Sequence, residues 1–174
     1  MRVIPTSFFL FVTTAAIAQM PYAGMQTRPI KALSEQQISD LNAGRGMGLA
    51  LAAELNGYPG PSHVLELADK LELSSDQRTK VEGLFASMKA EAQPIGSKLI
   101  AQESELDGLF ASRAITPDTL KASTATIAVT QGELREAHLK YHLSTAAVLT
   151  PLQMQRYAEL RGYGDDKPRH QHRH

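Results

Sequence analysis

The chain contains no cysteine and no tryptophan, and only 6% of its 174 residues are aromatic. Without cysteine, no disulfide can stabilise the fold and no thiolate can serve as a nucleophile or a metal ligand. The chain also lacks a Gly-x-Ser-x-Gly elbow, and the glycine-rich stretch from Gly44 to Gly48 lacks the Lys-Ser/Thr ending of a phosphate-binding loop. With so few aromatics to build a substrate pocket, we expect a protein that is not an enzyme.

Net charge is also missing, because 18 basic residues balance 18 acidic residues. A neutral chain has no long-range electrostatic field to attract a polyanion. We therefore expect no nucleic-acid partner.

Long apolar runs are confined to the start of the chain. Arg2 is the only charged residue before Gln19, apolar stretches follow it, and Ala16-Ile17-Ala18 has the small-x-small pattern of a signal-peptidase site. This pattern predicts a signal peptide over residues 1–18, cleaved near Ala18, and export to the bacterial periplasm. The alternative is an uncleaved anchor, which the shortness of the run and the nearby Pro21 disfavour.

A Leu-(Ser/Thr)-x-x-Gln pattern occurs three times, beginning at Leu33, Leu73 and Leu149. Physically it is a capping box, in which the hydroxyl accepts from the backbone N–H three residues on and the Gln side chain reaches back to the N–H of the cap. The expected pairs are Ser34 with Gln37, Ser74 with Gln77, and Thr150 with Gln153. Thr116-Pro117 marks a fourth helix start, because proline is well suited to the first helical position.

Between these starts the apolar residues have helical spacing. We expect a helix from Ser34 to about Asn56, a short helix over about 62–71, two long helices over about 75–112 and 117–148, and a last helix over 151–161. The long pair, joined by about four residues and bent at Pro94, must form an antiparallel hairpin. The predicted fold is therefore all-α: a flexible segment over 19–33, a single helical domain over 34–163, and a disordered His-containing tail over 164–174. Such a hairpin has little interior, so we expect a homodimer, intertwined or packed through the hairpin faces, or a higher assembly.

Leu73-Ser74-Ser75-Asp76-Gln77 and Leu149-Thr150-Pro151-Leu152-Gln153 bracket this hairpin. The arrangement resembles the Spy/CpxP superfamily of periplasmic proteins with twin LTxxQ motifs, and is nearest to its CnrX/ZraP-like branch of heavy-metal sensor and resistance proteins. The resemblance covers about residues 57–163, and the first motif departs from it by having Ser74 where threonine is usual. It implies a periplasmic stress protein, either a metal-binding sensor or an ATP-independent chaperone.

Histidines supply the candidate metal ligands. His138 and His142 are one helical turn apart, so both imidazoles leave the same helix face. His63 is the best third ligand and Glu66 the fourth, and the resemblance implies such a combination of an early helix with the late hairpin helix. The methionine of some related sites is replaced by His142, which favours Zn(II), Ni(II), Co(II) or Cu(II) over Cu(I). The alternative is that His138 is an ordinary packed or interface histidine.

The tail carries alternating histidines at His170, His172 and His174. Such a segment can capture metal with low affinity and little geometric selectivity. The alternative is a solvated tail with no function.

Two functions follow from these observations. The first is a metal-binding sensor or buffer in heavy-metal or envelope stress, working with a membrane-bound regulator. The second is a Spy/CpxP-like chaperone or stress-response modulator, whose bent hairpin dimer cradles unfolded client proteins. A purely structural interaction module is the third alternative.

Overall fold

A computed structural model describes residues 22–163. The predicted signal peptide and the tail histidines His170, His172 and His174 lie outside these residues. Every element in the described range is helical, which confirms the all-α fold: η1 (Met25–Thr27), α1 (Glu35–Asn42), α2 (Leu51–Glu54), α3 (Pro61–Glu66), α4 (Ser75–Ala111), α5 (Pro117–Val148) and α6 (Pro151–Leu160). None of these helices combines the length and the apolar character that a membrane span requires.

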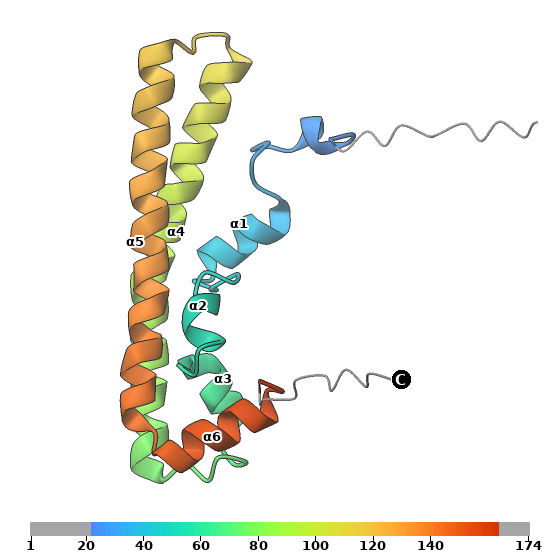
Figure 1. Cartoon of the computed structure of the whole chain (residues 1–174). Coiled ribbons are helices and arrows are strands. Elements are labelled where there is room, and N and C mark those ends of the chain that lie inside the picture. The colour runs from blue at the N-terminus through green and yellow to red at the C-terminus, as the bar shows by residue number, and fades with distance from the viewer. Residues whose placement is uncertain (1–21, 164–174) are drawn as a thin grey trace, which may run out of the picture.

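The long helices α4 and α5 pack against each other as the predicted antiparallel hairpin (Figure 1). Pro94 lies inside α4 without ending it. One buried apolar cluster joins the hairpin to α1 and comprises Leu41, Ala92, Leu99, Ile127 and Leu134. A second cluster lies at the open end of the hairpin, where α3 and α6 meet it, and comprises Val64, Leu71, Val81, Leu149 and Tyr157.

The structure forms a complete capping box at the start of α1, α4, α5 and α6. In each box the cap hydroxyl accepts from the third backbone N–H, and the side chain of that third residue accepts from the N–H of the cap. The caps are Ser34, Ser74, Thr116 and Thr150. Local sequence therefore decides where these helices begin.

The prediction of a single helix from Ser34 to about Asn56 is wrong. The helix ends at Asn42, a loop follows, and α2 begins at Leu51. Gly44, Met47 and Gly48 in this loop have φ angles of 65°, 44° and 83°, in the left-handed region that a right-handed helix excludes. Gly44 and Gly48 turn the chain at this point. The predicted short helix over 62–71 is also shorter, since α3 ends at Glu66.

The early part of the chain runs along the hairpin toward its open end, and α6 crosses beneath that end (Figure 1). Residues 22–33 form η1 and turns, with Ile30 buried and Lys31 paired to Asp107 of α4 at 3.0 Å. Close approach of α1 to α4 depends on Gly96, where a Cβ would lie 2.5 Å from the carbonyl oxygen of Leu41. This arrangement places the loops around α2 and α3 against the part of α5 that carries its two histidines.

Candidate functional site

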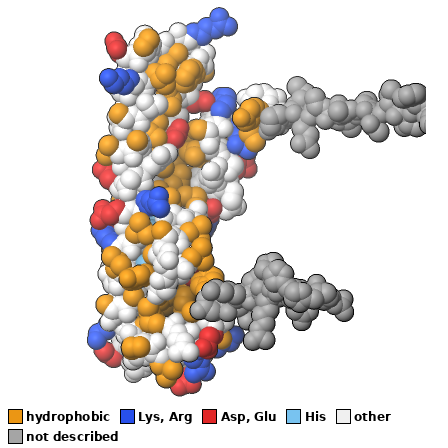
Figure 2. Space-filling model, in the orientation of Figure 1, with side chains coloured by type: hydrophobic (Ala, Val, Ile, Leu, Met, Phe, Trp, Pro, Cys, Tyr) orange, Lys and Arg blue, Asp and Glu red, His pale blue; other side chains and the backbone are white. Residues whose placement is uncertain are grey.

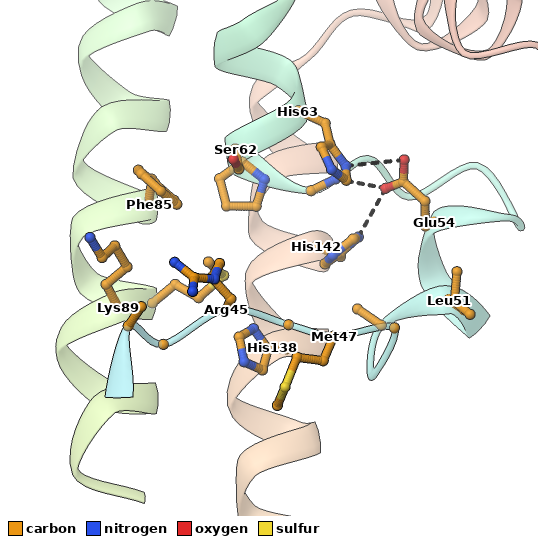
Figure 3. Close-up of a pocket in the computed structure, with 18 of the residues that line it drawn as sticks. Arg45, Met47, Leu51, Glu54, Ser62, His63, Phe85, Lys89, His138 and His142 are labelled. Atoms are coloured by element: carbon orange, nitrogen blue, oxygen red, sulfur yellow. Dashed lines mark hydrogen bonds and ion pairs between the residues drawn. The ribbon is translucent and has the colours of Figure 1, made fainter. Parts of the chain in front are cut away.

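A cavity of about 570 Å³ opens between the hairpin and the segment running from the α1–α2 loop to α3 (Figure 3). It is lined by all four predicted ligands: His63 and Glu66 of α3, and His138 and His142 of α5. Glu54, the last residue of α2, lines it too. Three separate elements thus bring the ionisable side chains to one place.

His142 is buried and firmly oriented. Its Nδ1 lies 2.7 Å from the carbonyl oxygen of Tyr58 and 3.7 Å from Oε2 of Glu54. A carbonyl only accepts, so Nδ1 donates this hydrogen bond, and in the neutral ring the lone pair is on Nε2. The ring packs against Gly60, where a Cβ would lie 2.8 Å from Cε1 of His142.

His63 faces the same carboxylate from α3. Its Nδ1 is 3.4 Å from Oε1 of Glu54, and this buried nitrogen has no hydrogen-bond partner. The side chain as a whole is 39% exposed. The imidazole therefore has room to turn without disturbing the core.

His138 lies one turn before His142 and is 2% exposed. Its Nε2 is buried without a hydrogen-bond partner, and its Nδ1 would be 3.4 Å from a Cβ at Gly46. Burial, with a smaller effect from the nearby His142, lowers the pKa of His138 below its usual value. The ring is therefore a neutral imidazole with a free lone pair at neutral pH.

Glu54 is the residue that the sequence analysis missed. It is 5% exposed and accepts hydrogen bonds from the phenol of Tyr157, from the backbone N–H of Gly60 at 3.2 Å, and from the phenol of Tyr163 at 3.3 Å. Nε of Arg161 lies 3.7 Å away. Burial, together with the hydrogen bond to the Glu54 carboxylate, raises the pKa of Tyr157. Glu54 thus connects the cavity histidines to the C-terminal helix α6 and to the residues that follow it.

The histidines and carboxylates share the cavity without converging on one point. Within residues 22–163, no three His, Cys, Asp or Glu side chains are close enough in this arrangement to hold a metal ion. His142 contacts the loop before α3, whereas His138 contacts the α1–α2 loop. Glu66 is exposed and accepts from the hydroxyl of Ser62 at 3.4 Å.

No protein-family model, curated protein or solved structure matches this chain. The chemistry of the cavity is therefore inferred from its own side chains.

Two features of the cavity are typical of metal-binding histidines. A ligating imidazole usually donates its second N–H to a carbonyl or a carboxylate, which sets the tautomer and orients the ring. His142 has both partners. Buried nitrogens without partners are rare in native proteins and call for an explanation, and His63 and His138 each have one.

Proposed function

We propose that the protein binds a divalent transition-metal ion in this cavity. The observation that carries the proposal is the gathering of three imidazoles with two carboxylates, where His63 and His138 keep unpartnered buried nitrogens and Nδ1 of His142 is held by the Tyr58 carbonyl. Neutral imidazoles and carboxylates are the donors that Zn(II), Ni(II), Co(II) and Cu(II) prefer.

The ligands would come from the end of the cavity that contains Glu54. His142 is held in place, and His63 is exposed enough to swing toward it. A carboxylate from Glu54 or Glu66 would complete the set, with His138 one turn away as a further donor. Because these side chains must move to converge, ion binding would draw α3 toward α5.

Such a movement suits a sensor or a buffer better than a rigid structural site. In the sensor role, the closed state would be recognised by a membrane-bound regulator. The resemblance to the CnrX/ZraP-like proteins supports this role, and the residue pattern over 1–18 supports the proposed periplasmic location. Cell fractionation of a tagged full-length protein tests the location, and retention in the cytoplasm would overturn it.

Calorimetric titration with Ni(II), Co(II), Zn(II) and Cu(II) tests the binding. The full-length protein would carry the His170→Ala, His172→Ala and His174→Ala substitutions, so that the tail cannot contribute. We expect one saturable site, weakened about 100-fold or more by His63→Gln with His142→Gln because two of the ligands are lost.

Absorption bands of bound Co(II) report its coordination number and supply a second measurement. Gln171→Ala in the same background is the matched control and should change neither affinity nor spectrum. Absence of a saturable site, or an affinity unchanged in the double histidine variant, would refute the proposal.

A chaperone role is the second candidate, and exposed apolar side chains on the hairpin favour it. Val129 and Leu143 of α5 are 61% and 58% exposed. The zero net charge counts against it, because it gives no long-range attraction for clients. Suppression of the aggregation of a reduced client at stoichiometric ratio would support this role, and loss of that effect in Val129→Asp with Leu143→Asp would locate it.

A further inference from the structure

Two methionines line the same cavity as His138. Met47 comes from the α1–α2 loop and Met88 from α4, while His138 comes from α5. Met88 is 7% exposed, so its sulfur is largely shielded from water. Two methionine side chains and one imidazole therefore line the cavity from three different elements.

Met47 has a conformation that apolar packing does not explain. Its φ angle is 44°, in the left-handed region that side-chain-bearing residues seldom adopt, and its side chain is still 42% exposed. The loop thus holds a strained residue without burying it. Figure 3 shows the sulfur of Met47 beside the ring of His138, on the side of the cavity away from Glu54.

The charges at this end differ from those around Glu54. His63 and His142 each have Glu54 within ion-pair distance, whereas no carboxylate of residues 22–163 is within that distance of His138. Arg45, which is paired with Asp40, and Lys89 line the cavity instead, and Figure 3 shows both on the side of His138. A singly charged ion is repelled by these cations half as strongly as a doubly charged one.

We propose that His138, Met47 and Met88 form a second site, which takes a soft monovalent cation, Cu(I) or Ag(I). Thioether sulfur is a soft ligand that selects Cu(I) over the divalent ions, and a neutral imidazole completes an uncharged donor set. The orphaned Nε2 of His138 supplies the lone pair. This site shares the cavity and His138 with the divalent site, but its two sulfur donors are its own and it needs neither His63 nor His142.

Ag(I), which does not change oxidation state in air, is the first probe. The full-length protein would carry alanine at positions 170, 172 and 174 and be labelled with ¹³C on its methionine methyl groups. We expect Ag(I) to shift the methyl signals of Met47 and Met88 and to leave those of Met25 and Met154 in place. Single Met→Leu variants assign the signals.

Affinity for Cu(I) is measured under nitrogen by competition with a chromophoric chelator. Met47→Leu with Met88→Leu preserves volume and should weaken binding about tenfold or more, since two of the three ligands are lost. The matched control, Met25→Leu with Met154→Leu, should bind as the parent does. Circular dichroism verifies that each variant is folded.

These measurements can refute the soft site and the divalent site independently of each other. The soft site would be refuted if Ag(I) left the methyl signals of Met47 and Met88 unchanged, or if the Met47/Met88 variant and its Met25/Met154 control bound Cu(I) equally well. Either result would stand regardless of the affinity measured for Ni(II). If His63→Gln with His142→Gln abolishes Ni(II) binding while the Ag(I) shifts persist, the donors are divided as proposed. If the Ag(I) shifts vanish in that variant, the soft site is not independent and the division is wrong.

Discussion

At the scale of single residues, Gly60 decides how the His142 ring sits. Its φ of −81° is ordinary for any residue, so the need for glycine is purely one of space. An alanine Cβ would lie 2.8 Å from Cε1 and 2.9 Å from Nε2 of His142, inside van der Waals contact. The obstacle is a buried ring held by the Tyr58 carbonyl, which cannot easily give way.

Gly60→Ala should therefore displace the imidazole and lower the free energy of unfolding by about 1–3 kcal/mol. Urea unfolding measures the loss, and the imidazole NMR signals of His142 report the movement. Gly83→Ala is the matched control: it lies within α4 with nothing near its Cβ, so it should stabilise the protein by about 0.5–1 kcal/mol. Equal effects of the two substitutions would contradict the steric argument.

Glu54 is the second residue whose effect can be tested alone. Glu54→Gln keeps the shape but removes the charge that faces Arg161, His63 and His142, and it weakens the acceptor for the Tyr157 phenol. We expect a loss of about 2–4 kcal/mol in unfolding free energy, because the partners stay buried. Glu105→Gln, on an exposed position of α4, should change it by less than about 0.5 kcal/mol. A Glu54→Gln protein as stable as its parent would show that the carboxylate is not needed as a charge.

The placing of His138 and His142 on one face was predictable because residue type and helical spacing are local properties. His138 and His142 share a helix face whatever the rest of the chain does. Glu54 was not predictable: it falls within a stretch of helical spacing, and nothing nearby in sequence indicates that Tyr157 and Tyr163 will meet it. Its burial arises only when the chain turns between α1 and α3 and α6 crosses the open end.

At the scale of elements, the capping glutamines of α4 and α6 do more than cap. Gln77 donates to Oε1 of Gln153 at 2.8 Å, and Gln153 donates to Oε1 of Gln77 at 3.0 Å. Their second amide hydrogens reach the carbonyls of Val148 and Leu71. This reciprocal pair ties the start of α4 to the start of α6 and closes the open end of the hairpin.

Gln77→Ala and Gln153→Ala should each cost about 1–3 kcal/mol, and together less than their sum, with a coupling of about 0.5–3 kcal/mol in a double-mutant cycle. Either change alone already breaks the pair, which is why the two are not additive. Gln37 caps α1 in the same way, so Gln37→Ala shows the cost of a lost cap. Strict additivity of the Gln77 and Gln153 changes would contradict the pairing.

The sequence predicts the starts of the capped helices but not the break between α1 and α2, and the difference has a physical cause. A capping box is complete within four residues, so its sequence is sufficient evidence. The break at 43–50 depends on glycines that a helix also tolerates, and on Met47, whose left-handed conformation no local rule indicates. Glycine spacing alone cannot distinguish a close-packing helix face from a turn.

At the scale of the whole molecule, the hairpin leaves apolar surface uncovered at its tip. Phe110, near the end of α4, is 54% exposed, and Leu120, at the start of α5, is 38% exposed. Figure 2 shows apolar side chains gathered at this tip. A long hairpin buries few residues for its size, and a second copy is the partner we propose for this surface.

The tip makes the dimer testable. Sedimentation velocity of the full-length protein should show a concentration-dependent dimer. Phe110→Asp with Leu120→Asp should weaken dimerisation by about 3 kcal/mol, or roughly 100-fold, because two apolar side chains lose their burial and a charge is introduced in place of each. Val129→Asp, which is exposed midway along α5, is the matched control and should dimerise as the parent does. If the parent protein sediments as a monomer at every concentration, there is no dimer. If the control loses the dimer and the tip variant keeps it, the interface lies on the outer face of α5 instead.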